Sequence, residues 1–293
     1  MKLGLGTVQF GLEYGISAER DKVAQPMVEK ILEYAAQKNI DVIDTAALYG
    51  SSEEALGNCL PSNHEFKIVT KTPFFSDVIT QGDADALERV FLQSLTKLKQ
   101  SSVYGLLIHR ADDLLREGSE LLWERMLQLK QQGLIKKIGA SIYTAAQIDA
   151  LLARYDFDLI QLPISVFDQR LLATGHLKTL KQRGVEIHAR SVFLQGLLLK
   201  DPALLTGSLV SARQRLQHYH AVLRVFDVSP IQASMHFVLQ QPDIDCVIVG
   251  VRSVQHLDEL VVASYKSMNA AFDYAPFALQ DEKILNPSQW NLR

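Results

Sequence analysis

Four side chains whose types suit proton transfer, Asp44, Tyr49, Lys71 and His109, lie at or just after the ends of short β-rich runs. A tyrosine is a poor acid at neutral pH because its pKa is about 10. A neighbouring ammonium group favours the phenolate and lowers that pKa, and a carboxylate beside the ammonium keeps it charged and oriented. A histidine can donate a hydrogen bond to a carbonyl oxygen as charge develops there. These residue types predict a proton-delivery site without a metal or a covalent nucleophile, which suits carbonyl reduction if a hydride donor is supplied.

The elements that must position these residues alternate along the chain between short β-rich runs and helical patterns. We expect strands over residues 3–8, 42–44, 67–71, 104–109, 137–141, 159–162, 185–191 and 246–249. We expect helices over residues 23–38, 52–58, 84–99, 120–132, 145–155 and 171–183, and another after residue 252. Several strands are almost entirely apolar, as is typical of a parallel sheet with both faces covered. Repeats of this kind without a linker predict an α/β fold, a single (β/α)8 TIM barrel over residues 1–293.

Two segments exceed the bare repeat. Residues 192–230 are longer than one helical crossover needs, so we expect an extended loop after strand seven that covers one mouth of the barrel. Residues 270–293 form a C-terminal tail, which either packs on the barrel or helps to roof a site. Side chains that either line a substrate pocket or belong to the core are Phe10, Tyr14, Phe193 and Trp290.

The bulk composition argues against several classes of protein. A net charge of −3 gives no basic field for nucleic acid or an anionic membrane. No stretch approaches about 18 uninterrupted apolar residues, and the N-terminal residues do not resemble a signal peptide. Cys59 and Cys246 form no CxxC motif and no zinc-binding spacing. We therefore expect a cytoplasmic protein that binds no metal and acts on a small molecule, and the sequence indicates no protein partner.

Several motifs, in order along the chain, resemble the aldo-keto reductase family. They are LGLGTVQFG, IDTAALYG, IVTKT, LLIHRAD, GASIY and VIVGVRS, at predicted strands one to five and eight. The resemblance covers about the whole chain and implies an NADPH-dependent oxidoreductase that reduces an aldehyde or ketone by direct hydride transfer. It implies that Tyr49 is the general acid and Lys71 its pKa-lowering partner. It also implies that Asp44 holds Lys71 and that His109 orients the substrate carbonyl.

The same resemblance implies a site for NADP. Ser141 and Gln161 match the positions that hold the carboxamide, and Arg252 suits a 2′-phosphate because a guanidinium binds phosphate bidentately. The full set of matching positions is Gly6, Thr7, Ser141, Gln161, Arg190, Ser191, Gly250, Arg252, Ser253, His256 and Glu259.

Some positions depart from the family's pattern. Ile142 stands where many relatives have asparagine, and Arg190 stands where an aromatic ring usually stacks on the nicotinamide. Leu260 replaces a common asparagine that contacts adenine, and Gly250 replaces a lysine found in some relatives. These departures leave the preference for NADP over NAD open.

Two other functions stay open as alternatives. A non-catalytic nicotinamide-binding sensor or regulatory barrel would keep the cofactor site and oxidise the cofactor negligibly. A Schiff-base lyase would use Lys71 as its nucleophile and would need that amine uncharged. The nearby Asp44 argues against the lyase.

Overall fold

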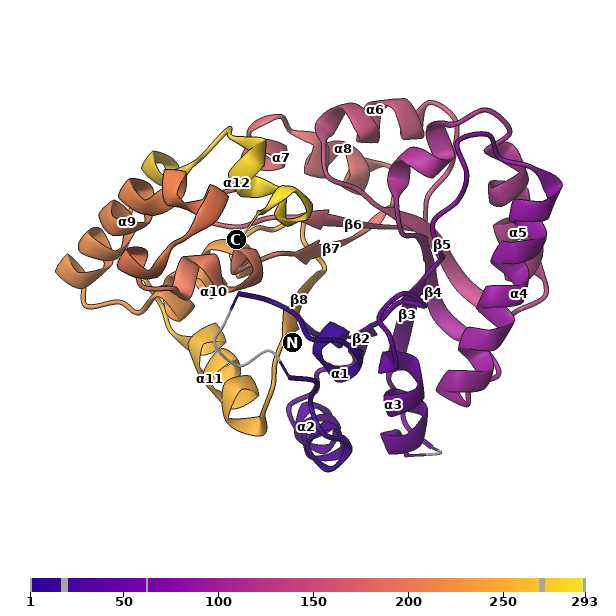
Figure 1. Ribbon diagram of the computed structural model, residues 1–293, viewed down its shortest axis with the longest axis horizontal. Coiled ribbons are helices and arrows are strands. Elements are labelled where there is room, and N and C mark those ends of the chain that lie inside the picture. The colour runs from indigo at the N-terminus through magenta and orange to yellow at the C-terminus, as the bar shows by residue number, and fades with distance from the viewer. Residues whose placement is uncertain (1, 17–20, 62, 269–271, 292–293) are drawn as a thin grey trace.

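The computed structural model describes residues 2–16, 21–61, 63–268 and 272–291. In these residues eight parallel strands close into a barrel, with each strand paired to the next and β8 paired back to β1. The helices surround the strands (Figure 1). The predicted α/β TIM barrel is therefore confirmed.

The strands are short and mostly buried. Their bounds are β1 (Leu3–Gly6), β2 (Val42–Asp44), β3 (Lys67–Lys71), β4 (Val103–Ile108), β5 (Ile135–Ser141), β6 (Leu159–Pro163), β7 (Glu186–Arg190) and β8 (Cys246–Gly250). Asp44 and Lys71 end their strands as predicted. Because the strands are parallel, these two ends and those of β4 to β8 face the same mouth of the barrel.

The helices begin at recognisable start signals. Thr80 and Asp83 form a capping box before α4, and Ser229 caps α10 directly before Pro230. The α-helices are α1 (Val8–Gly11), α2 (Gln25–Gln37), α3 (Ser52–Cys59), α4 (Gln81–Leu98), α5 (Glu120–Gln131), α6 (Ala145–Leu152), α7 (Arg170–Ala173), α8 (His176–Gln182), α9 (Arg213–Val225), α10 (Pro230–Leu239), α11 (Val254–Tyr265) and α12 (Glu282–Leu285). The 3₁₀-helices are η1 (Ala111–Leu115), η2 (Leu194–Leu199), η3 (Pro202–Leu204), η4 (Gly207–Ala212), η5 (Ala275–Phe277) and η6 (Pro287–Gln289). In the described ranges, none of the helices is long and apolar enough to cross a membrane.

The prediction of one helix over residues 171–183 is wrong, because the chain forms two helices there. Gly175 separates α7 from α8 with a φ of 75°, a left-handed conformation that favours glycine. Leu171 before the break and Leu177 after it are both buried. The apolar pattern therefore continues across the break, and periodicity alone did not reveal it.

An apolar layer fills the interior of the barrel, formed by Val42, Val69, Leu107, Leu159, Cys246 and Ile248. Gly139 permits the close approach of two strands in this region, since a Cβ atom there would lie 1.7 Å from the carbonyl oxygen of Leu159. Polar residues lie on both sides of the layer. Asp44 and Lys71 follow it along their strands, and Glu186 begins β7 at the other end.

The segment after β7 is long, as predicted, and contains η2, η3, η4 and α9 before α10 begins. The C-terminal residues pack against this segment. The backbone nitrogen of Ser208 donates to the carbonyl oxygen of Asn291 at 2.9 Å, and the Phe277 ring lies edge-on to Tyr219. Figure 1 shows the yellow α12 beside the orange helices that follow β7. The tail thus packs on the additional helices of the barrel.

Candidate active site

The ammonium group of Lys71 is the centre of the candidate site. It is almost completely buried and donates to both carboxylate oxygens of Asp44, at 2.8 and 2.7 Å, and to the carbonyl oxygen of Thr45 at 2.9 Å. The hydroxyl oxygen of Tyr49 accepts from the same nitrogen at 3.5 Å. A buried charge is costly unless it is paired and hydrogen-bonded. Asp44 therefore holds Lys71 beside Tyr49.

A tight turn after β2 places Tyr49 at the mouth of the barrel. The Tyr49 nitrogen donates to the carbonyl oxygen of Ala46, and α3 begins three residues later, at Ser52. Gly50 has a φ of 56°, and a Cβ atom there would lie 2.5 Å from the carbonyl oxygen of Gly11. The turn therefore requires glycine directly after Tyr49.

His109 follows β4 and faces Tyr49. The two rings lie edge-on, with their centroids 5.7 Å apart, and the backbone nitrogen of His109 donates to Oγ1 of Thr72 at 3.2 Å. Burial, together with the charges of Lys71 and Arg190, lowers the pKa of His109 to about 3. The imidazole is therefore neutral at physiological pH, and one of its ring nitrogens carries a hydrogen for donation.

The pKa of Tyr49 is raised above its ordinary value, first by burial and then by the negative charge of Asp44. This direction is opposite to the one expected from a nearby ammonium group alone. The reason is that Asp44 pairs with Lys71 and neutralises its field, while burial also lowers the pKa of Lys71 itself. The phenol therefore keeps its proton at neutral pH. Among the described residues, that proton has no hydrogen-bond acceptor.

Gln161 and Ser141 lie beside this cluster, at neighbouring strand ends. The amide nitrogen of Gln161 donates to Oδ1 of Asp44 at 2.7 Å, so it is bound to the carboxylate that holds Lys71. Ser141 is buried at the end of β5, where it pairs with Gln161, and Ile142 after it is fully buried. Of the two predicted carboxamide positions, Gln161 contacts Asp44 and its amide is engaged there, while Ser141 lies opposite Gln161 on the neighbouring strand.

Gly6 and Thr7 lie at the end of β1, also beside Asp44. The Thr7 hydroxyl donates to the carbonyl oxygen of Asp44 at 2.9 Å and accepts from the hydroxyl of Ser52 at 2.8 Å. Gly6 pairs with Asp44 on one side and with Gly250 on the other. These hydrogen bonds tie the first strand to the turn that carries Tyr49.

Arg190 is the last residue of β7, at the mouth of the barrel. Its Nη2 donates to the carbonyl oxygen of Ile142 at 3.0 Å and its Nη1 to Oγ of Ser191 at 3.2 Å. The guanidinium carbon lies 4.2 Å from the centre of the Tyr143 ring. The predicted nicotinamide-stacking position is thus occupied by a guanidinium that is itself stacked on a tyrosine.

The start of α11 gathers the remaining predicted cofactor residues. Oγ of Ser253 accepts from the backbone nitrogen of His256 at 3.2 Å and caps the helix, with Glu259 one turn further along. Arg252 precedes the cap, and its Nη2 donates to the carbonyl oxygen of Asp21. A helix N-terminus with a serine and an arginine favours an anion, so this donor set fits a phosphate group.

The loop from Ser191 to Gly196 is the predicted pyrophosphate segment. Its backbone has positive φ angles at Ser191 (62°), Leu194 (46°), Gln195 (53°) and Gly196 (97°). Successive left-handed residues turn the chain sharply and form concavities that suit anions. The loop has the turned backbone expected of an anion-binding segment, and the nitrogens of Leu194 and Gly196 donate to the carbonyl oxygens of Ser191 and Phe193.

Two aromatic residues of the site were missed from the sequence. Phe74 is 55% exposed and its ring centroid lies 5.2 Å from that of His109, and Tyr143 carries Arg190. Both follow a strand end by two or three residues, and that position was the available signal. Of the four suggested pocket residues, Tyr14 has its pKa raised to about 12, first by loss of water around its hydroxyl and then by Tyr49. Phe10 is instead fully buried in the core.

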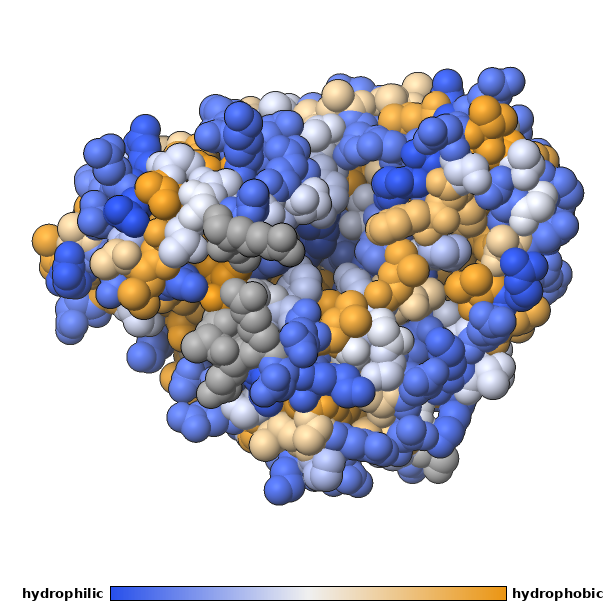
Figure 2. Space-filling model, viewed as in Figure 1, coloured by the Kyte–Doolittle hydropathy of each residue, from blue (hydrophilic) through white to orange (hydrophobic). Residues whose placement is uncertain are grey.

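Figure 2 shows a hollow near the middle of the face drawn, with hydrophilic residues at its floor and hydrophobic ones on part of its rim. Comparison with Figure 1 places this hollow over β6 and β7, between α12 and the segment around β5. Gln161 and Arg190 belong to these two strands. The polar floor of the hollow is consistent with a site for a polar ligand.

A second polar cluster lies at the opposite end of the barrel and was not predicted. The Glu186 carboxylate accepts from the Tyr104 hydroxyl at 2.7 Å, contacts Nε2 of His188 at 2.7 Å and pairs with Lys137. Tyr104, Lys137 and Glu186 come from three different strands and lie far apart in sequence, so no local motif reveals the cluster.

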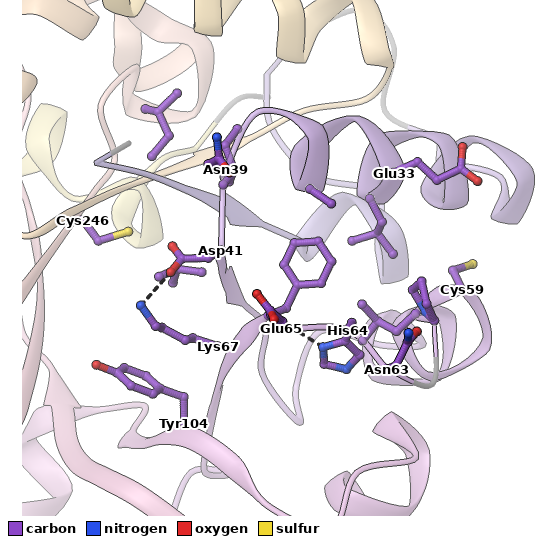
Figure 3. Close-up of a pocket in the computed structure, with 18 of the residues that line it drawn as sticks. Glu33, Asn39, Asp41, Cys59, Asn63, His64, Glu65, Lys67, Tyr104 and Cys246 are labelled. Atoms are coloured by element: carbon purple, nitrogen blue, oxygen red, sulfur yellow. Dashed lines mark hydrogen bonds and ion pairs between the residues drawn. The ribbon is translucent and has the colours of Figure 1, made fainter.

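A hollow of about 1090 Å³ adjoins this second cluster. Figure 3 shows the ion pair of Asp41 and Lys67 between Cys246 and Tyr104 in its wall. Within the described ranges, no three His, Cys, Asp or Glu side chains are grouped so that they could hold a metal ion. The strand residues that line the hollow lie at the amino ends of the strands, so the hollow is separate from Lys71 and Tyr49 at the other end of the barrel.

Comparison with known proteins connects this geometry to a family. A family model described as "Aldo/keto reductase family" matches residues 2–273. An uncharacterized oxidoreductase of Bacillus subtilis, YqkF, is 24% identical over 280 residues, which cover 90% of this chain and 87% of that protein.

Solved structures show the same fold. The holo form of the aldo-keto reductase AKR11C1 from Bacillus halodurans superposes with a TM-score of 0.73 at 19% identity, covering 97% of this chain and 92% of the other. A putative aldo-keto reductase from Pseudomonas aeruginosa gives a TM-score of 0.66 at 24% identity, covering 90% and 89%.

Proposed function

The chain belongs to the aldo/keto reductase family, and on this premise we propose that it is an NADPH-dependent oxidoreductase that reduces an aldehyde or ketone. The observation that carries the proposal is the Lys71 ammonium held between the Asp44 carboxylate and the Tyr49 hydroxyl. The phenol proton, which has no acceptor among the described residues, is available to a substrate oxygen. A cytoplasmic location is part of the proposal.

In this proposal the substrate carbonyl oxygen binds between Tyr49 and His109. NADPH, when bound, would supply the hydride that the carbonyl carbon accepts. As negative charge develops on the oxygen, neutral His109 donates a hydrogen bond to it and Tyr49 transfers its phenolic proton. Lys71, 3.5 Å from the tyrosine oxygen, then stabilises the phenolate that remains. The product is the alcohol, and Tyr49 recovers its proton from solvent.

The cofactor would be held by groups along the same mouth. Ser141 and Gln161 would bind the carboxamide, and Gly6 and Thr7 would lie beside the ribose. The left-handed loop from Ser191 would receive the pyrophosphate. At the start of α11, the 2′-phosphate and adenosine would contact Gly250, Arg252, Ser253, His256 and Glu259. The capped helix and the loop conformation support this arrangement.

The alternatives have less support. The Schiff-base lyase needs an uncharged, accessible amine, whereas Lys71 is 1% exposed and paired with both oxygens of Asp44. The non-catalytic sensor keeps the cofactor residues and gives no role to the adjacent Tyr49 and His109. We therefore favour the reductase.

The experiment that tests the proposal measures NADPH and NADH binding by quenching of protein fluorescence, followed by cofactor oxidation with a panel of aldehydes and ketones. We expect tighter binding of NADPH and turnover of at least one carbonyl. Arg252→Ala should weaken NADPH binding by about tenfold or more and NADH binding much less, because a charged hydrogen bond to phosphate is lost. Equal losses of NADPH and NADH affinity in Arg252→Ala would exclude a contact of Arg252 with the 2′-phosphate. Cofactor binding without turnover of any carbonyl would favour the non-catalytic sensor.

A further inference from the structure

Arg190 is a partly buried cation at the mouth of the barrel. Among the described residues no carboxylate forms an ion pair with it, and its hydrogen bonds go to the carbonyl oxygen of Ile142 and the hydroxyl of Ser191. Arg110, which also lies at the mouth, differs in this respect because it pairs with the buried Asp113. A partly buried cation without a counter-ion is costly unless a ligand supplies one.

The guanidinium is fixed in orientation. Its stacking on Tyr143 and its two hydrogen bonds hold the plane in one position. A guanidinium has about five N–H donors, so two bonds leave donors for a ligand. A planar group held in this way is suited to bidentate binding of a carboxylate or a phosphate.

Arg190 also lies within electrostatic reach of the proposed reaction centre. Its positive charge is among the causes that lower the pKa of His109, and it opposes the rise in the pKa of Tyr49 and of Tyr14. Lys71 and Asp44, which also lie near Tyr49, are paired with each other. Arg190 is therefore, among the described residues, a cation close to Tyr49 and His109 that no ion pair neutralises.

We propose that Arg190 binds an anionic group of the carbonyl substrate, so that the preferred substrates are aldehydes or ketones that carry a carboxylate or a phosphate. This inference rests on the proposed function and specifies its substrate class. The position of Arg190 corresponds to a ring-stacking residue in the family resemblance. The nicotinamide ring has no negative charge in either redox state, so it provides no counter-ion for the guanidinium. An anionic group of the substrate would provide that counter-ion.

The first test needs no turnover. Benzoate and its neutral isostere benzamide are titrated into the protein with NADPH present, and again without it, by isothermal calorimetry. We expect benzoate to bind more tightly than benzamide. Arg190→Met should weaken benzoate binding by about tenfold or more, with Arg190→Lys intermediate. The matched control Arg110→Met, in which Asp113 keeps Arg116 as a partner, should leave it unchanged. Benzoate binding that survives Arg190→Met would overturn the proposal.

The second test compares kcat/KM for para-formylbenzoate with that for its methyl ester, and for glyceraldehyde phosphate with that for glyceraldehyde. The wild type should have a higher kcat/KM for the anionic member of one or both pairs. The pair with the larger ratio shows whether Arg190 favours a carboxylate or a phosphate. Arg190→Met should lower that preference by about tenfold to a hundredfold. An unchanged preference together with weaker NADPH binding would assign Arg190 to the cofactor and overturn the proposal. Failure to reduce any carbonyl would contradict the proposed function, while the benzoate titration would still decide the anion site.

Discussion

The two ends of the barrel contain the same four kinds of side chain, a carboxylate, a lysine, a tyrosine and a histidine. At the carboxyl ends of the strands they are Asp44, Tyr49, Lys71 and His109, and towards the amino ends they are Tyr104, Lys137, Glu186 and His188. Residue type alone therefore does not distinguish a reactive site from a structural one.

The two clusters differ in whether the tyrosine hydroxyl has a hydrogen-bond acceptor. The Tyr104 hydroxyl donates a hydrogen bond to Glu186, which also contacts His188 and Lys137. Although burial raises the pKa of Glu186, the hydrogen bonds from His188, Lys137 and Tyr104 hold it below its ordinary value. At the other end, Asp44 is occupied by Lys71 and Gln161, and Tyr49 has no acceptor for its proton among the described residues. A tyrosine hydroxyl that is hydrogen-bonded to a carboxylate stabilises the fold, whereas an unused hydroxyl donor can serve a substrate.

The largest effect is expected when the same atom is removed at each end. Tyr49→Phe should lower kcat by about a thousandfold, because general acid catalysis typically contributes about 10²–10⁴. Tyr104→Phe removes the matching hydroxyl at the amino end and should leave kcat within about twofold. Both variants are measured by cofactor oxidation with the best carbonyl of the panel, and circular dichroism checks their fold. Normal turnover by Tyr49→Phe would refute its role as proton donor.

A second pair of variants separates rate from stability. Asp44→Asn should lower kcat by about a hundredfold, since Lys71 loses the charge that holds it beside Tyr49. Glu186→Gln should leave kcat nearly unchanged and lower the free energy of unfolding by about 2 kcal/mol, because Lys137 loses its counter-ion. Urea denaturation and steady-state kinetics measure the two quantities.

The stability difference of Glu186→Gln should also depend on pH. Since the pKa of Glu186 is lowered in the folded protein, its contribution is complete above about pH 4.5 and is lost as the pH falls towards the folded value. The deficit of the variant should therefore shrink in acid. If Glu186→Gln lowered kcat as much as Asp44→Asn, the proposed division between a reactive and a structural end of the barrel would be wrong.

The smallest effect is expected in the pH profile of the wild type. The pKa of Tyr49 is raised and that of His109 is lowered to about 3, so neither group changes its protonation between about pH 5 and about pH 9. We expect kcat/KM to vary by less than about threefold over this range. A steep fall on the acid side would show that His109 titrates, and a fall on the alkaline side would assign a lower pKa to Tyr49.

Much of this protein was predictable from local patterns. Apolar runs alternating with helical periodicity indicated the barrel, and Asp44, Lys71 and His109 were predicted to lie together because they follow strand ends. The break at Gly175 was missed because the buried positions continue through it. Phe74 and Tyr143 were missed because loop side chains have no periodicity to orient them.

The sequence by itself determined the order of the strands, the residues at their carboxyl ends and hence the neighbours that a parallel barrel must bring together. Only the tertiary structure decided how hydrogen bonds and charges are shared among those neighbours. It paired Gln161 with Asp44, raised the pKa of Tyr49 and left Arg190 without a counter-ion among the described residues. The physical reason is that burial and pairing depend on distances between segments far apart in the chain, whereas periodicity reports only on residues within one element.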